Sequence, residues 1–103
     1  MKQITKDTFH ELVEESTTLC VLDFYADWCG PCRMMAPIME ELEREYPAVS
    51  FYKVNVDNER ELASMFHVES IPLIAFVKNN TFLDMSLGYV PKDKIKGMIE
   101  ENM

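Results

Sequence analysis

The sequence predicts an α/β protein built on a mixed sheet of about five strands flanked by about four helices. Residues 19–26 form an almost unbroken apolar run with the length and composition of a buried central strand. Apolar residues at helical spacing follow over 35–46, and residues 51–56 are rich in β-branched and aromatic side chains, as strands are. Alternation of buried strands with amphipathic helices is typical of an α/β fold.

From the amino terminus to Phe66 we expect the order β-α-β-α-β-α. A short strand near Gln3-Ile4 precedes a helix that Thr5 can cap and that turns inward Phe9, Leu12 and Val13. The long helix after the central strand contains Pro37, which should kink it, and it buries a face made of Met35, Ile38, Met39, Leu42 and Tyr46. The strand at 51–56 leads to a short helix that Asn58 can cap and that holds Leu62, Ala63 and Phe66.

The last third of the chain is expected to form a hairpin and a helix. Residues 73–77 and 82–87 are predicted strands joined through Asn79-Asn80, because asparagine tolerates the positive φ of a tight hairpin turn. Pro91 starts a last helix with one apolar face, made of Ile95, Met98 and Ile99. No linker, repeat or low-complexity tract interrupts the chain, so residues 1–103 are expected to form one domain.

Charge and composition exclude several classes of function. The chain carries 18 acidic against 10 basic side chains, a net charge of −8, and its only basic cluster is Lys92, Lys94 and Lys96. Binding to nucleic-acid phosphates is therefore disfavoured. No segment approaches the roughly 18 apolar residues that span a bilayer, and no signal peptide is visible. Three cysteines do not make a disulfide framework, so we expect a cytoplasmic protein in a reducing compartment.

The most informative run is Trp28-Cys29-Gly30-Pro31-Cys32, which lies between the predicted central strand and the long helix. Pro31 suits the first turn of a helix, so Cys29 falls just ahead of it, beside unpaired amides and the positive end of the helix dipole. A thiolate is stabilised there, and the thiolate is the nucleophile in disulfide exchange. Position alone therefore assigns attack to Cys29 and resolution of the mixed disulfide to Cys32.

Two other interpretations of the cysteine pair stay open at this point. The cysteines can be buried structural residues, although Gly30-Pro31 would fill a core poorly. A zinc module would need four ligands, and the remaining candidates, Cys20, His10 and His67, lack finger-like spacing. Cys20 itself, in the central strand, is interpreted as a small buried hydrophobe, with regulatory oxidation as the alternative.

The chain resembles the thioredoxin family. The resemblance rests on residues 23–32 with the Cys-Gly-Pro-Cys motif, on Lys53, on Ile71-Pro72 and on Gly88, which follow the family's order along nearly the whole chain. It implies the strand order 1-3-2-4-5 and the reduction of protein disulfides by dithiol exchange, without a cofactor beyond the Cys29–Cys32 disulfide itself. It also implies a monomer that is regenerated by a thioredoxin reductase and acts on disulfide-containing proteins. The alternative is a non-catalytic docking subunit that uses the apolar surface around Trp28 and Pro72.

The resemblance also assigns further site residues. Asp23 matches a carboxylate behind the cysteines that assists proton transfer with the resolving thiol, and Lys53 matches its neighbour. We expect burial to raise the pKa of Asp23 and Lys53 to oppose part of the rise, with a structural ion pair as the alternative. Ile71-Pro72 matches a cis-proline loop, and an apolar substrate surface is implied for Trp28, Gly30, Pro31, Ile71, Pro72 and Gly88. The chain departs from common family residues, in ways that bear on specificity, at Tyr25, Ser70 and Leu73.

Overall fold

The protein, described here from a computed structural model that covers residues 1–103, is built on one five-stranded sheet in the order β1-β3-β2-β4-β5. β1, β3 and β2 run parallel, whereas β4 is antiparallel to β2 and to β5. The strands are Lys2–Gln3 (β1), Cys20–Tyr25 (β2), Ser50–Asn55 (β3), Leu73–Lys78 (β4) and Thr81–Leu87 (β5). The strand order implied by the family resemblance is confirmed, and the sheet is mixed as the sequence predicts.

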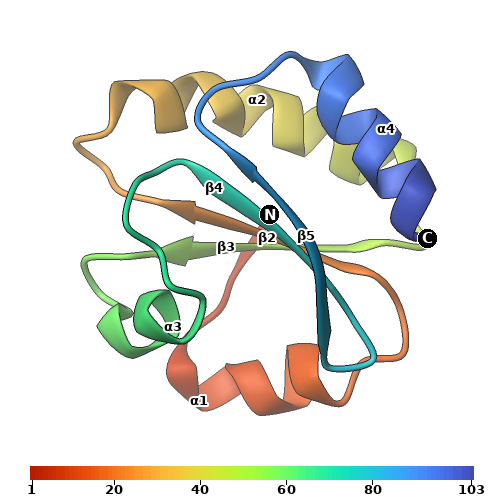
Figure 1. The fold of residues 1–103 in the computed structure, drawn as a ribbon, viewed down its shortest axis with the longest axis horizontal. Coiled ribbons are helices and arrows are strands. Elements are labelled where there is room, and N and C mark those ends of the chain that lie inside the picture. The colour runs from red at the N-terminus through yellow and green to blue at the C-terminus, as the bar shows by residue number, and fades with distance from the viewer.

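Helices cover both faces of the sheet (Figure 1). One face carries α2 and α4, and the other carries α3 and the first helix, which begins as α1 and continues as the π-helical segment η1. Their bounds are Lys6–Phe9 (α1), His10–Glu14 (η1), Gly30–Glu45 (α2), Arg60–Met65 (α3) and Lys92–Asn102 (α4). The helix start expected at Thr5 is confirmed, since Thr5 is the N-cap of α1 and its N–H donates to Thr8 Oγ1 at 3.0 Å.

Two apolar clusters, one on each face, explain why β2 is apolar without alternation. Leu22 and Phe24 belong to the cluster beneath α1 and α3, whereas Val21 belongs to the cluster beneath α2 and α4. Successive side chains of a strand point to opposite faces, so a strand covered on both faces needs apolar residues throughout. Asp23, two residues after Val21, therefore points to the α2 face, where it is an exception in an apolar layer.

The start of α3 differs from the prediction. The N-cap is Glu59 rather than Asn58, and it caps without a side-chain hydrogen bond. Asn55 organises the turn instead, because its carbonyl oxygen accepts from the N–H groups of Asn58 (3.2 Å) and Glu59 (2.9 Å). The Glu59 carboxylate reaches another helix, where it accepts the N–H of Lys6 at 2.8 Å, one of the unpaired amides of α1.

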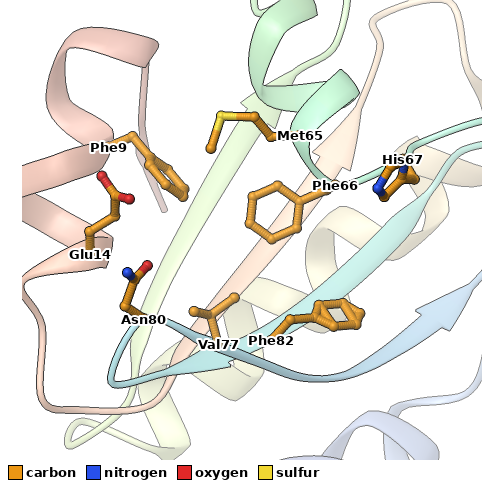
Figure 2. A pocket seen from close by; sticks show the side chains of 8 residues that line it. All are labelled: Phe9, Glu14, Met65, Phe66, His67, Val77, Asn80 and Phe82. Atoms are coloured by element: carbon orange, nitrogen blue, oxygen red, sulfur yellow. The ribbon is translucent and has the colours of Figure 1, made fainter.

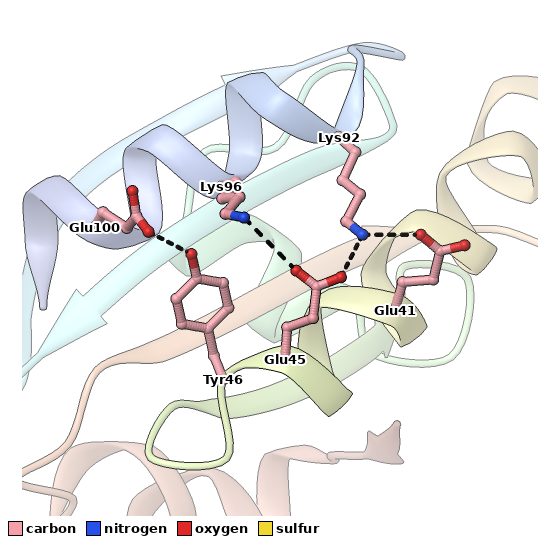
Figure 3. A network of polar contacts seen from close by, with 6 residues as sticks. All are labelled: Glu41, Glu45, Tyr46, Lys92, Lys96 and Glu100. Atoms are coloured by element: carbon pink, nitrogen blue, oxygen red, sulfur yellow. Dashed lines mark hydrogen bonds and ion pairs between the residues drawn. The ribbon is translucent and has the colours of Figure 1, made fainter.

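The predicted basic cluster on the last helix is largely neutralised by α2. Figure 3 shows Lys92 between the carboxylates of Glu41 and Glu45. The Nζ of Lys96 lies 3.9 Å from Oε1 of Glu45. The same pair of helices is linked by Tyr46, whose hydroxyl donates to a carboxylate of α4 at 2.7 Å, which raises the pKa of Tyr46 to about 12. These lysines therefore serve the α2–α4 contact.

Candidate active site

The two cysteines of the motif lie at the amino end of α2, where the sequence places them. Cys29 is the N-cap residue, and its Sγ accepts a hydrogen bond at 3.2 Å from the N–H of Cys32, one of the amides of the first turn that have no partner within the helix. The Cα atoms are 5.2 Å apart and the sulfur atoms are within disulfide-bonding distance. Both residues are buried, at 4% exposure for Cys29 and 3% for Cys32. The helix therefore offers one donor directly to the sulfur that is predicted to attack.

The Ile71-Pro72 loop faces the cysteines, and its peptide bond is cis, as the family resemblance implies. The carbonyl oxygen of Ile71 lies 3.9 Å from Cys29 Sγ. The Pro72 carbonyl accepts the N–H of Gly88 at 2.8 Å, and Gly88 has a φ of 79°, which favours glycine. Pro72 is itself buried, so it shapes this loop while its neighbours carry the exposed surface.

Trp28 borders the same side of the site and is held by a residue that sequence reasoning missed. The indole is 69% exposed, yet its Nε1–H donates to Asp57 Oδ2 at 2.9 Å. Asp57 is in turn tied to the end of β3, because its N–H donates to Asn55 Oδ1 at 2.9 Å. A signal existed: Trp28 follows β2 and Asp57 follows β3, and the carboxyl ends of neighbouring parallel strands lie at the same edge of a sheet.

An open groove of about 390 Å³ runs beside Trp28. Its wall includes Ile71 and Ser70 from the cis-proline loop, together with Val56, Val68 and Glu69. Gly30 and Pro31 lie between the cysteines, and Pro31 is exposed. Of the predicted surface residues, Trp28 and Ile71 line this groove, and most of its lining is apolar.

Asp23 and Lys53 lie behind the cysteines. They are paired in register on β2 and β3, and both line a cavity of about 190 Å³ that also reaches Cys32. Asp23 is 4% exposed, and no protein group donates a hydrogen bond to its Oδ1. Burial raises the pKa of Asp23 to about 7, and the positive charge of Lys53 opposes part of that rise. This is the direction that the sequence predicts.

No salt bridge joins Asp23 to Lys53. The ion pairs of the protein involve other groups, so the alternative of a structural buried ion pair has no direct contact to support it. A carboxyl group with a pKa near neutrality, in a cavity shared with a thiol, can accept or return a proton at physiological pH.

The other residues singled out in the sequence lie away from this site. Cys20 is buried on β2, with its Sγ 3.7 Å from the Thr18 carbonyl oxygen, and burial raises the pKa of its thiol. A raised pKa keeps sulfur protonated and poorly nucleophilic. His10 pairs with Glu14 on the surface. No three His, Cys, Asp or Glu side chains gather as a metal-binding group, and no helix is long and apolar enough to cross a membrane.

A second apolar pocket, of about 280 Å³, lies on the face of the sheet that α1 and α3 cover, opposite the face to which Asp23 points (Figure 2). Figure 2 shows the rings of Phe9, Phe66 and Phe82 around its opening, with Glu14 at the rim. None of the residues that line it belongs to the predicted site.

The whole chain is similar in sequence and fold to known proteins. The family model described as thioredoxin matches residues 1–101. Thioredoxin 1 of a Nostoc species is 36% identical over 102 residues, which cover 98% of this chain and 95% of the relative. The chloroplastic M-type thioredoxin of Pisum sativum is 41% identical over 101 residues, which cover 96% of this chain and 59% of the relative. The X-ray structure of Fasciola hepatica thioredoxin, 35% identical, superposes with a TM-score of 0.93 and covers 100% of both chains.

Proposed function

The chain belongs to the thioredoxin family and is a thiol-disulfide oxidoreductase that reduces protein disulfides, and on this premise we propose how its residues divide the reaction. The observation that carries the proposal is the hydrogen bond from the Cys32 N–H to Cys29 Sγ at 3.2 Å. A donor aimed at sulfur stabilises the thiolate over the thiol. Cys29 is therefore the nucleophile and Cys32 the resolving thiol.

The reaction proceeds in two exchanges. In the first, the Cys29 thiolate attacks one sulfur of the substrate disulfide, the substrate S–S bond breaks, and the other substrate sulfur leaves as a thiolate that takes up a proton. In the second, Cys32 loses its proton and attacks Cys29 Sγ, which closes the Cys29–Cys32 disulfide and releases the second substrate thiol. Two electrons pass from the dithiol to the substrate, and a thioredoxin reductase, the family's usual partner, returns them.

Asp23 is the base for the second exchange. It shares a cavity with Cys32, and its pKa of about 7 leaves a substantial fraction ionised at neutral pH. As Cys32 attacks the mixed disulfide, its thiol proton passes to the Asp23 carboxylate in this cavity. Lys53 keeps the pKa of Asp23 from rising further, so that an ionised base is available.

The substrate surface consists of Trp28, Gly30, Pro31 and Ile71, shaped by Pro72 and Gly88. The groove beside Trp28 offers apolar contact, and the Ile71 backbone faces Cys29, which suits an extended peptide bound by main-chain hydrogen bonds. The non-catalytic docking function is not favoured, because the two cysteines of the motif are both present and at bonding distance.

The wider setting follows from composition. The net charge of −8 and the pairing of Lys92 and Lys96 with carboxylates oppose binding to nucleic acids and anionic membranes. We place this monomeric protein in the cytoplasm, with residues 1–103 as one domain and the Cys29–Cys32 disulfide as its only redox group. A buried, protonated Cys20 is compatible with that reducing compartment.

Trapping of substrates tests the division of roles. Cys32→Ser should keep the nucleophile but lose the intramolecular escape route, so substrate proteins should accumulate as adducts that dithiothreitol releases. Cys29→Ser should trap little, and both variants are best made in a Cys20→Ser background so that Cys20 forms no adducts. Non-reducing gels of lysate passed over each immobilised variant give the measurement. Equal trapping by the two variants would overturn the assignment.

A further inference from the structure

The side chain of Tyr25 crosses a strand. Tyr25 belongs to β2 and its hydroxyl accepts a hydrogen bond from Gln3 Nε2, on β1, at 3.0 Å. Because β3 lies between β1 and β2 in the sheet, the bond spans β3. The phenol ring is therefore fixed at both ends over β3, because the Tyr25 backbone is anchored in β2 and the Tyr25 hydroxyl is bound to β1.

Lys53 is the residue of β3 that lies at this crossing. It is in register with Gln3 on one side and with Asp23 on the other, so the three residues form a row across the sheet. The Lys53 ammonium lies 5.8 Å from the centroid of the Tyr25 ring, within the range of a cation–π contact. It makes no salt bridge. The ring is thus the fixed partner of an otherwise unpaired cation.

We propose that Tyr25 is a positioning residue for the resolving exchange: its ring, anchored by Gln3, holds the Lys53 ammonium beside the Asp23 carboxyl. This rests on the proposed function, in which Asp23 is the base for Cys32. Lys53 has a long and flexible side chain, and without the ring its ammonium is free to turn into solvent, where water screens its charge. Tyr25 therefore sets how strongly Lys53 acts on the base.

Other charged groups face Asp23 and do not replace Lys53. The two cavities that Asp23 lines are also lined by Asp27, Arg33, Glu40, Lys53 and Met1. Of the cations, Arg33 donates to the Asp27 carbonyl oxygen at 2.7 Å, and the amino group of Met1 pairs with Glu43 at 3.5 Å. Lys53 alone among them is held by neither a hydrogen bond nor an ion pair, so its position depends on the ring.

The test is a double-mutant cycle read on the Asp23 carboxyl. The carboxyl ¹³C resonance of Asp23, assigned by its loss in Asp23→Asn, is titrated in the oxidised protein, where Cys29 and Cys32 do not titrate. Tyr25→Leu, Lys53→Met and the double variant complete the cycle. Removing the ring also admits water to Asp23, which lowers its pKa, but this effect is the same in both Lys53 backgrounds and cancels in the cycle.

We expect Tyr25→Leu to raise the titration midpoint more, or lower it less, when Lys53 is present than when it is methionine. The difference between the two backgrounds should be roughly half to one pH unit. Coulomb's law gives a shift of this size when a cation retreats from about 6 Å to about 10 Å from a carboxylate, at an effective dielectric constant near 20. A difference of zero would show that the ring does not position Lys53. A difference of opposite sign would show that the ring holds the ammonium away from Asp23. Either result overturns the proposal.

Three further variants serve as controls for the double-mutant cycle. Tyr52→Leu is the matched control, since Tyr52 is a half-buried tyrosine of β3 that packs into the cluster on the opposite face, and it should leave the midpoint unchanged. Tyr25→Trp keeps an aromatic face but loses the hydroxyl that accepts from Gln3, so it should shift the midpoint less than Tyr25→Leu does. Tyr25→Phe, which loses only the Gln3 bond, should shift the midpoint part of the way and repeats the cycle if the leucine variant does not fold.

Failure of this inference is separable from failure of the proposed function. If Asp23→Asn does not slow resolution by Cys32, Asp23 is not the base, whatever the cycle gives. If Asp23→Asn slows resolution but the cycle shows no coupling, Asp23 keeps its role and Tyr25 loses the one assigned here.

Discussion

Replacing Asp23 with asparagine should stabilise this protein at neutral and alkaline pH. The carboxyl is buried among apolar residues and no protein group donates a hydrogen bond to its Oδ1, so its charged form lacks the solvation it has in water. Its pKa rises from the ordinary aspartate value of 3.8 to about 7. At about 1.4 kcal/mol per unit, that rise corresponds to about 4 kcal/mol of destabilisation once the carboxyl is ionised. Asparagine has nearly the same volume and removes the charge.

The effect has a defined direction and pH window. Between about pH 4 and about pH 7 the folded protein retains the Asp23 proton, whereas the unfolded chain has already released it. The folded state therefore binds more protons, and the free energy of unfolding that Asp23 contributes falls as pH rises, by about 1.4 kcal/mol per unit. This contribution of Asp23 to the free energy of unfolding is fully present below about pH 4 and fully lost above about pH 7.

Urea denaturation of the oxidised wild type and Asp23→Asn, at several pH values from about 4 to about 8, measures the difference. All other titratable groups are common to both proteins, so their contributions cancel in the comparison. We expect the two stabilities to agree near pH 4 and the variant to be more stable by about 4 kcal/mol near pH 8. A difference that does not change with pH would refute the reasoning, because it would mean that Asp23 titrates alike in the folded and unfolded states.

Three other predictions follow from the site and the helix contacts. The fluorescence of Trp28, the only tryptophan, should change reversibly with dithiothreitol, since the indole is adjacent in sequence to Cys29 and fixed by Asp57; an emission spectrum insensitive to a redox change verified by thiol titration would contradict this placement. Asp23→Asn should slow resolution by Cys32 roughly 10- to 100-fold while initial attack changes less, and unchanged stopped-flow rates from about pH 6 to about pH 9 would make Asp23 structural. Lys92→Met should lower the thermal midpoint slightly at low salt. The loss should shrink in about 1 M salt, because the ion pairs of Lys92 with α2 are partly exposed and salt screens them. A loss independent of salt would assign the destabilisation to packing.

Most of the fold is predictable from the sequence because its signals are local. The apolar run before Trp28 and the helical spacing after it identify a strand and a helix, and the cysteine motif falls in the turn between them. Asn79 and Asn80 both have positive φ, as the hairpin prediction requires. The order of the strands was beyond local signals and came from the family resemblance, since pairing joins segments that are distant in the chain.

The sequence by itself thus indicated the redox chemistry: two cysteines at a helix start, with Pro31 in its first turn, predict a nucleophile and a resolving thiol, and the family motifs along the chain favour disulfide exchange over the other interpretations. Only the tertiary structure decided what holds the site in place. It brings Asp57 to the Trp28 indole, Glu59 to the first turn of α1, and Gln3 across β3 to Tyr25. The physical reason is that each of these bonds joins segments far apart in the chain, which only strand pairing and helix packing bring together. The bond from Gln3 to Tyr25 also depends on strand register, because a shift of one residue would send the side chain to the other face of the sheet.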